Sequence, residues 1–151
     1  MVKHPKDSLT ESVHIVVPKH LNGGNRLFGG TLLNWIDDVG AVAARRHAGG
    51  MVTGASVDNV QFLGPAFQNE TIICVGKVTY VGRTSMEVCV KSYAETLDGE
   101  RRLINVAYQV AVAIDENGKP VPVPALEPET DEEKAEYENA KKRKEFRNLY
   151  R

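Results

Sequence analysis

Residues 28–48 read FGGTLLNWIDDVGAVAARRHA, and this stretch decides the fold. Apolar residues recur in it at helical spacing, which predicts one long helix over residues 31–48. Gly49 and Gly50 end the helix, because glycine readily adopts the left-handed backbone that often follows a helix. On a helical wheel one face is apolar and consists of Leu32, Leu33, Ile36, Val39, Gly40 and Ala43.

Two adjacent aspartates in this helix have different predicted surroundings. Asp37 falls at the edge of the apolar stripe, beside Leu33 and Ala44, whereas Asp38 falls on the polar face. Partial burial suits a carboxylate base or nucleophile, because desolvation destabilises the charged form. We therefore interpret Asp37 as a candidate catalytic group, and a structural hydrogen bond is the alternative.

The turn-rich stretch over residues 18–30 ends in Phe28, Gly29 and Gly30, directly before the predicted helix. The first N–H groups of a helix have no partner inside the helix, and glycines leave them open to a ligand. Such amides bind anions or stabilise an oxyanion. Close packing of the helix on a sheet is the alternative, and the glycine spacing matches neither a phosphate loop nor a dinucleotide fingerprint.

After this helix the period of the apolar residues changes to two. Four strands are predicted, over residues 52–62, 71–81, 84–95 and 102–114, with turn signals between them. One more strand, over residues 10–17, precedes the helix. The order of strand, helix and four strands predicts an α+β fold in which one long helix lies against one antiparallel sheet.

The end of the chain is different in kind. Thr130 and Glu133 match a capping box, and the helix that follows runs from acidic to basic, as the helix dipole prefers. We therefore divide the chain into a domain over residues 1–125 and a helical extension over residues 126–151. A phosphate-attracting patch is the alternative interpretation of the basic end.

Composition excludes several classes of function. The chain has 151 residues and a net charge of -1, which indicates one domain without a global attraction to nucleic acid or membrane. Neither a signal-peptide core nor an apolar run of about 20 residues occurs, so we expect a soluble, cytoplasmic protein. Cys74 and Cys89 lie in apolar runs, and the four histidines show no ligand spacing. We expect no metal site, no cofactor and no cysteine nucleophile.

Several segments together resemble one enzyme family. They are Asn22, LFGGTLL at 27–33, WIDD at 35–38, ASVD at 55–58, FLGP at 62–65, GRTSME at 82–87, VPVP at 121–124 and EPET at 127–130. The pattern spans nearly the whole chain and resembles the hot-dog-fold acyl-CoA thioesterases, in the group of the bacterial acyl-CoA hydrolases and the cytosolic long-chain (brain-type) hydrolases.

The resemblance implies a hot-dog fold, in which a curved antiparallel sheet wraps a long central helix. It also implies homodimers with joined sheets, assembled into a trimer of dimers, that is, a hexamer. The activity implied is hydrolysis of fatty acyl-CoA to fatty acid and CoA, and CoA is then part of the substrate. In the family the helix aspartate activates water or attacks the thioester, and a loop asparagine of the partner holds the carbonyl. These roles fall on Asp37 and Asn22.

The substrate would contact two further groups of residues. The thioester carbonyl would face the backbone amides of Gly29, Gly30 and Thr31. The CoA phosphates require cations, and Arg83, beside Thr84 and Ser85 at a predicted turn, is the candidate. A merely solvated turn arginine is the alternative for Arg83.

One departure from the family affects the asparagine. Family members have glycine three residues after it, whereas Asn25 stands at that place here. Asparagine tolerates a left-handed backbone, so the loop keeps its shape, or else it shifts and Asn25 replaces Asn22. A non-catalytic acyl-CoA sensor on the same fold is the main rival. A hot-dog dehydratase is a weaker one, since it needs a histidine near the start of the helix, and His47 stands at the far end.

Overall fold

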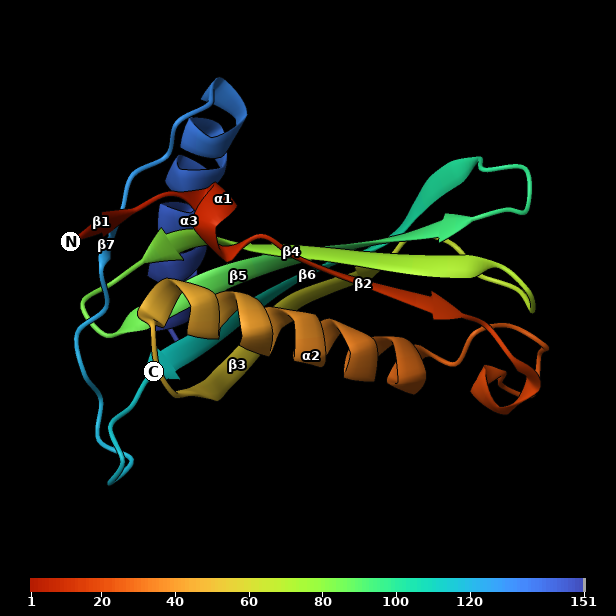
Figure 1. The fold of residues 1–151 in the computed structure, drawn as a ribbon, viewed down its shortest axis with the longest axis horizontal. Coiled ribbons are helices and arrows are strands. Elements are labelled where there is room, and N and C mark those ends of the chain that lie inside the picture. The colour runs from red at the N-terminus through yellow and green to blue at the C-terminus, as the bar shows by residue number, and fades with distance from the viewer. Residues whose placement is uncertain (151) are drawn as a thin grey trace.

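A computed structural model describes residues 1–150 and shows a five-stranded antiparallel sheet with a long helix on each face (Figure 1). Helix α2 (Gly29–Ala48) lies along one face, and helix α3 (Asp131–Asn148) lies on the other. The strands are β2 (Thr10–Ile15), β3 (Val52–Phe62), β4 (Thr71–Val81), β5 (Ser85–Glu95) and β6 (Arg101–Ala113). Their order across the sheet is β2-β4-β5-β6-β3, so β2 and β3 are the edges. The predicted α+β fold is confirmed.

The predicted elements agree closely with the observed ones. Strands β3 and β4 begin and end where the sequence predicts, and β5 and β6 deviate by one residue. Strand β2 ends at Ile15, before residues 16 and 17 that the prediction included, and a 3-10 turn (Pro18–His20) follows. Helix α2 begins at Gly29 rather than at residue 31, and Gly49 ends it with a left-handed φ of 72°.

The core lies between α2 and the sheet. Met86, Val88 and Val90 alternate along β5 on the face towards α2, and all three are almost fully buried. Burial of a side chain of this kind stabilises the fold by about 1.5–3 kcal/mol. On β4 a glycine, Gly76, lets Val39 of α2 approach closely, because a Cβ there would lie 2.8 Å from the Val39 side chain. The helix is therefore seated on the sheet at a fixed position.

Helix α3 crosses the other face at one end of the sheet (Figure 1), and a buried ion pair holds it there. The Arg143 guanidinium donates to both carboxylate oxygens of Glu87 on β5 and lies 3.8 Å from the centre of the Tyr108 ring. Thr79 Oγ1 also donates to the Glu87 carboxylate, at 2.6 Å. The capping box is confirmed, since the Glu133 amide donates to Thr130 Oγ1 at 3.0 Å. The last residue of the predicted extension, Arg151, lies outside the described residues.

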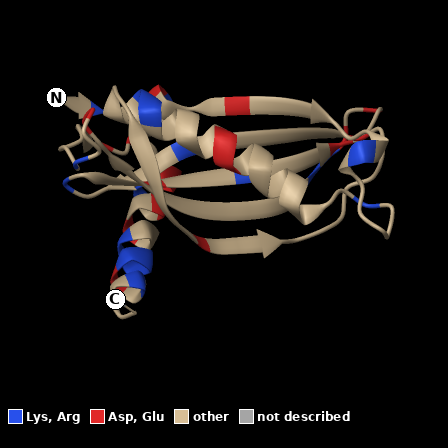
Figure 2. Ribbon diagram, turned by 90° about the horizontal axis from the view of Figure 1, so that it is seen from below, with Lys and Arg blue, Asp and Glu red and all other residues tan. Residues whose placement is uncertain are grey.

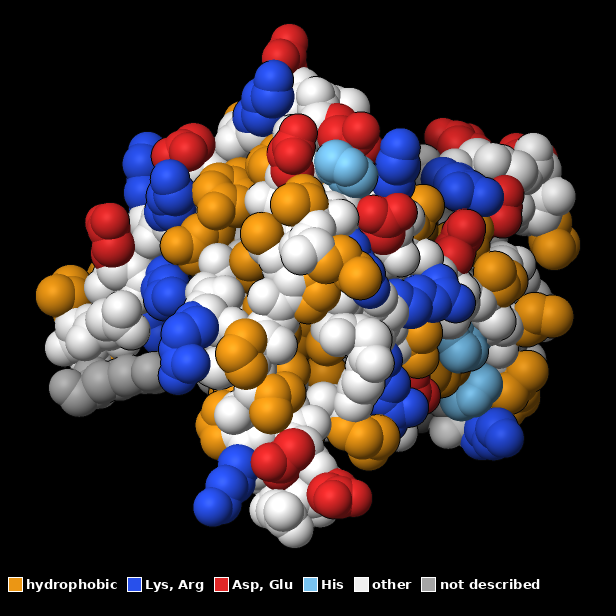
Figure 3. Space-filling model, turned by 60° about the vertical axis from the view of Figure 1, so that its left-hand side comes forward, with side chains coloured by type: hydrophobic (Ala, Val, Ile, Leu, Met, Phe, Trp, Pro, Cys, Tyr) orange, Lys and Arg blue, Asp and Glu red, His pale blue; other side chains and the backbone are white. Residues whose placement is uncertain are grey.

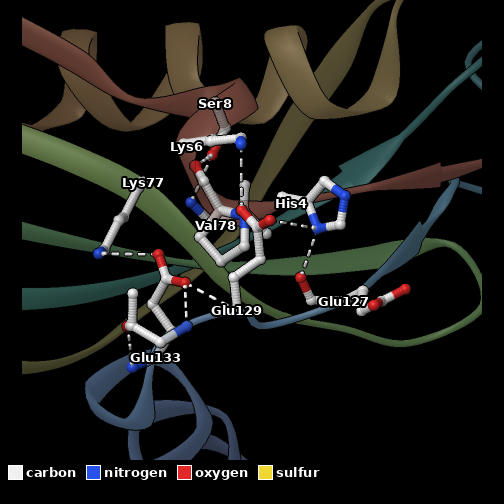
Figure 4. A network of polar contacts seen from close by, with 10 residues as sticks. His4, Lys6, Ser8, Lys77, Val78, Glu127, Glu129 and Glu133 are labelled. Carbon is white, nitrogen blue, oxygen red and sulfur yellow. Dashed lines mark hydrogen bonds and ion pairs between the residues drawn. The ribbon is translucent and has the colours of Figure 1, made fainter.

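The N-terminal residues form elements that the sequence pattern does not predict. Strand β1 (Val2–Lys3) pairs in parallel with β7 (Ala125–Leu126), and a short helix α1 (Pro5–Ser8) follows β1. Figure 4 shows the polar contacts around them: His4 Nδ1 meets the Glu127 carbonyl, and Ser8 Oγ accepts from the Val78 amide. These contacts join the N-terminal residues to the segment that precedes α3.

The surface agrees with the small net charge. Figure 3 shows acidic, basic and apolar side chains interspersed on the face at the end of the molecule where the chain begins. Within residues 1–150 no helix is long and apolar enough to cross a membrane.

Candidate active site

A cleft of about 530 Å³ opens between helix α2 and the edge strand β3. Its size is within the range of small-molecule sites, about 300–1,000 Å³. Most of its lining is apolar, and the residues are Gly30, Leu33, Asn34, Ile36 and Asp37 of α2, Val57 and Val60 of β3, and Gln109 of β6. Leu33 is 37% exposed, so it lines the cleft instead of joining the core as the wheel predicts.

Asp37 is the carboxylate of this cleft, and Asp38 is not part of its lining. Figure 2 shows the acidic residues in the middle of α2. Burial lowers the pKa of His14 on β2, and His20 lowers it further, while the charge of Asp38 opposes both effects. Asp38 therefore lies towards the β2 side of α2 and Asp37 towards β3. In one chain, however, the Asp37 side chain is exposed, and the predicted partial desolvation is absent.

The glycines at the start of α2 serve both packing and amide exposure. A Cβ on Gly30 would lie 2.6 Å from the Phe28 ring, and a Cβ on Gly29 would contact the Phe62 ring at 3.4 Å. The Thr31 amide donates to the Phe28 carbonyl at 3.0 Å. Over residues 1–150 the amides of Gly29 and Gly30 have no hydrogen-bond acceptor. The predicted carbonyl-binding amides therefore reduce to these two, since that of Thr31 is engaged.

The loop that carries Asn22 keeps its shape through Asn25. Asn25 adopts a left-handed φ of 59°, which a glycine would adopt more easily. The Asn22 side-chain oxygen accepts from the Gly24 and Arg26 amides at 2.8 and 3.2 Å, so its amide nitrogen points away from these loop contacts. Asn22 is exposed and does not line the cleft of its own chain.

Arg83, Thr84 and Ser85 lie at the turn between β4 and β5, and the fold does not bring them to Asp37 of the same chain. Ser85 pairs with Val112 near the end of β6, and the Thr84 carbonyl accepts from the Ala113 amide. Arg83 is exposed and forms no ion pair with the other residues that the structure describes. Only a second copy of the chain can bring this turn to the cleft.

Neither cysteine has the properties of a nucleophile. Burial raises the pKa of the Cys89 thiol to about 11, and burial also raises that of Cys74. Among the described residues no cluster of three or more histidine, cysteine or acidic side chains has the arrangement of a metal site. His47 is buried at the end of α2, where its Nε2 meets the Pro124 carbonyl at 2.8 Å.

A larger hollow, of about 750 Å³, lies beside the end of α3. Its lining includes Arg143 and Arg147, which are already paired with Glu87 and Asp58. These cations are therefore not available to a substrate without the loss of an ion pair. We accordingly place the candidate active site in the α2–β3 cleft.

Gln109 is a cleft residue that the sequence did not indicate as functional. Its Nε2 donates to the Ile36 carbonyl at 3.1 Å, and its side chain packs against Gly40. Two features of the sequence could have indicated Gln109. It is a polar residue between Ala107 and Ala111 on the core-facing side of its strand, and the apolar stripe of the helix contains a glycine, Gly40.

Residues 24–99 match a family described as the thioesterase superfamily. The chain is 44% identical over 129 residues to a protein of Bacillus subtilis named uncharacterized acyl-CoA thioester hydrolase. The aligned region covers 85% of this chain and 75% of that protein. An acyl-CoA hydrolase of Staphylococcus aureus, solved with butyryl-CoA and CoA, superposes with a TM-score of 0.94 at 36% identity, over 99% of this chain and 92% of the other. A solved apo-hexameric acyl-CoA thioesterase superposes with a TM-score of 0.96 at 41% identity, over 99% of this chain and 96% of the other.

Proposed function

The chain belongs to the thioesterase superfamily and is an acyl-CoA thioester hydrolase, and on this premise we propose that Asp37 and Asn22 are its catalytic residues. Fatty acyl-CoA is the proposed substrate, and each site combines Asp37 of one chain with Asn22 of another. The observation that carries the proposal is the position of Asp37, the carboxylate in an apolar cleft that also contains Gly30 at the start of α2.

A comparison of spacing supports the two residues. Alanine variants of the Staphylococcus aureus hydrolase have been solved at an aspartate and, separately, at an asparagine fifteen residues before it. Asn22 precedes Asp37 by the same number of residues. Because the cleft of one chain lacks Asn22, the amide must come from a neighbouring copy.

The proposed reaction consumes one water molecule. Asp37 takes a proton from this water, and the resulting hydroxide adds to the thioester carbonyl carbon. The tetrahedral intermediate then expels the CoA thiolate, which receives the proton. In the alternative route the Asp37 carboxylate attacks the carbonyl itself, and water hydrolyses the transient anhydride. Label found in Asp37 after a single turnover in H₂¹⁸O would establish the second route with attack of water on the aspartyl carbonyl, because in the first route ¹⁸O enters only the fatty acid.

The charge on the carbonyl oxygen requires donors. The amides of Gly29 and Gly30 have no acceptor elsewhere within residues 1–150, and they lie at the positive end of the α2 dipole. The amide nitrogen of Asn22 supplies a third donor. Loss of one oxyanion donor lowers kcat by about 10²–10³-fold, and we expect an effect of this order when Asn22 is removed.

The edge strand β3 supports assembly into dimers. It is 11 residues long, and its exposed apolar side chains include Val57 and Phe62. A long apolar edge that stays unpaired favours aggregation, so we propose that β3 of two copies pair and that the sheets become continuous. Such pairing would also bury the exposed Asp37. Hexamers among the structural neighbours support a trimer of these dimers.

Two matched variants test the proposal. Asp37→Asn keeps the size of the side chain but removes the base, so kcat on acyl-CoA should fall by on the order of 10²–10⁴-fold. Asp38→Asn, one residue along and outside the cleft, should change kcat by less than about tenfold. Release of free thiol from a C2 to C18 acyl-CoA panel provides the measurement. Full activity of Asp37→Asn would exclude the mechanism, and binding of acyl-CoA without turnover by the unmodified protein would favour a sensor.

A further inference from the structure

Gln109 and Ile36 form the floor of the α2–β3 cleft. They are the most buried residues of its lining, 8% and 1% exposed, whereas Val57 at its mouth is 54% exposed. Gln109 projects from β6 and its Nε2 donates to the Ile36 carbonyl, which connects the sheet to the helix across the floor. Behind this contact lies the closely packed core between α2 and the sheet.

The Gln109 amide occupies a notch in the helix that only glycine permits. A Cβ at Gly40 would lie 2.6 Å from Gln109 Oε1 and 2.8 Å from both Cδ and Nε2. The neighbours of Gln109 on the same strand face, Ala107 and Ala111, are small. The side chain therefore fills the space between the strand and the helix almost completely.

We propose that Gln109 determines the acyl selectivity of the enzyme by closing the floor of the cleft against long acyl chains. The inference rests on the proposed function, in which the thioester lies beside Asp37. An acyl chain that extends inward from there meets the Gln109 side chain one helical turn further along α2, at Gly40. The Gln109 side chain blocks the path by its volume. Short acyl groups end before this wall and are preferred.

The test is a ratio of specificity constants on one preparation. The kcat/KM for dodecanoyl-CoA is divided by that for butanoyl-CoA, so the fraction of correctly folded enzyme cancels. Gln109→Ala opens the floor and should raise this ratio at least tenfold. Gln109→Asn, which shortens the side chain by one methylene and keeps the amide, should raise it about threefold. Gln109→Leu has nearly the volume of glutamine and should stay within about threefold of the unmodified enzyme.

A substitution at Gly40 should change the ratio of specificity constants in the opposite direction. Gly40→Ala places a methyl group where the Gln109 amide lies, which pushes the amide into the cleft, so the ratio should fall at least threefold. The control is Tyr108→Phe on the same strand, because Tyr108 faces α3 and Arg143 on the other side of the sheet. This variant should leave the ratio unchanged.

The outcomes separate the two proposals. An unmodified protein that hydrolyses no acyl-CoA of any length would overturn the proposed function. An active protein whose ratio is unchanged in Gln109→Ala would overturn only the inference about selectivity. Equal shifts in Gln109→Ala and Gln109→Leu would also overturn it, because the wall would then not act through its volume.

Discussion

Arg143 on α3 and Glu87 on β5 share two hydrogen bonds, of 2.8 and 2.9 Å, beneath the C-terminal helix. The Glu87 side chain is only 3% exposed, so its charge is neutralised inside the protein. The pair attaches α3 to the sheet face opposite the cleft. Arg143 also pairs with Glu136, at 2.9 Å, so loss of Arg143 leaves the buried Glu87 carboxylate without an ion pair, whereas loss of Glu87 leaves the guanidinium with one carboxylate.

Glu87→Gln should destabilise the fold by about 2–3 kcal/mol, which is below most of the range of about 3–5 kcal/mol for a buried pair that loses one partner, because Arg143 keeps its pair with Glu136 and some contact with water. Urea denaturation gives the free energy of unfolding. The matched control is Glu138→Gln, which removes the exposed pair with Lys141 and should cost less than about 1 kcal/mol. Similar losses in the two variants would show that the buried pair has no special role.

His47 should make stability depend on pH. Burial lowers its pKa, while the hydrogen bond to the Pro124 carbonyl and the nearby Asp7 oppose this shift and Lys3 adds to it. The folded protein therefore binds the proton less readily than the unfolded chain does. Stability is complete above the unfolded pKa of about 6.5 and is lost as the pH falls through the lower folded value.

Thermal unfolding at pH 7.5, 6.5 and 5.5 measures this effect. In His47→Gln the fall in Tm between pH 7.5 and 5.5 should be smaller than in the unmodified protein, because glutamine has no proton to gain. Burial also lowers the pKa of His14, so His14 should contribute to the pH dependence of stability as well. His14→Gln measures that contribution. An unchanged slope in His47→Gln would refute the assignment to His47.

Subunit mixing tests the shared site. Asn22→Ala and Asp37→Asn should each be nearly inactive alone, Asn22→Ala by on the order of 10²-fold. A mixed dimer has one site without either residue and one intact site. After subunit exchange, each mixed dimer should regain about half the activity of an unmodified dimer. If exchange is proven by mass and no activity returns, both residues act within one chain.

Arg83 provides a test of CoA recognition. If its guanidinium pairs with a CoA phosphate in the site of a neighbouring copy, Arg83→Ala should raise KM about tenfold with little change in kcat. The effect should shrink on a pantetheine thioester, which lacks the nucleotide. Equal losses on both substrates would show that Arg83 does not contact phosphate.

Much of the fold was predictable from periodicity. The strand ends at Thr71 and Val81 follow from an apolar alternation bounded by turn residues, and the capping box at Thr130 follows from local chemistry. The parallel pairing of Val2 with Ala125 was not predictable, because two-residue strands carry no periodic signal. The domain boundary after residue 125 stays a prediction.

For the candidate site, the sequence predicted features that depend on local geometry. The wheel separated Asp37 from Asp38, and the tolerance of asparagine for a left-handed backbone anticipated Asn25. The prediction that Leu33 packs in the core was wrong, because the apolar stripe of α2 is wider than the surface that the sheet covers. Gln109 was missed because its partners, Ile36 and Gly40, are about 70 residues away in the sequence.

The parallel pair β1–β7 has a consequence for synthesis on the ribosome. Val2 and Lys3 are made more than 100 residues before their partners Ala125 and Leu126. Contacts between such distant segments form late, because the chain between them must first be ordered. Strand β1 therefore stays unpaired until residues 125 and 126 have been made. A premature stop before residue 125 would release a chain in which β1 has no β7 to pair with.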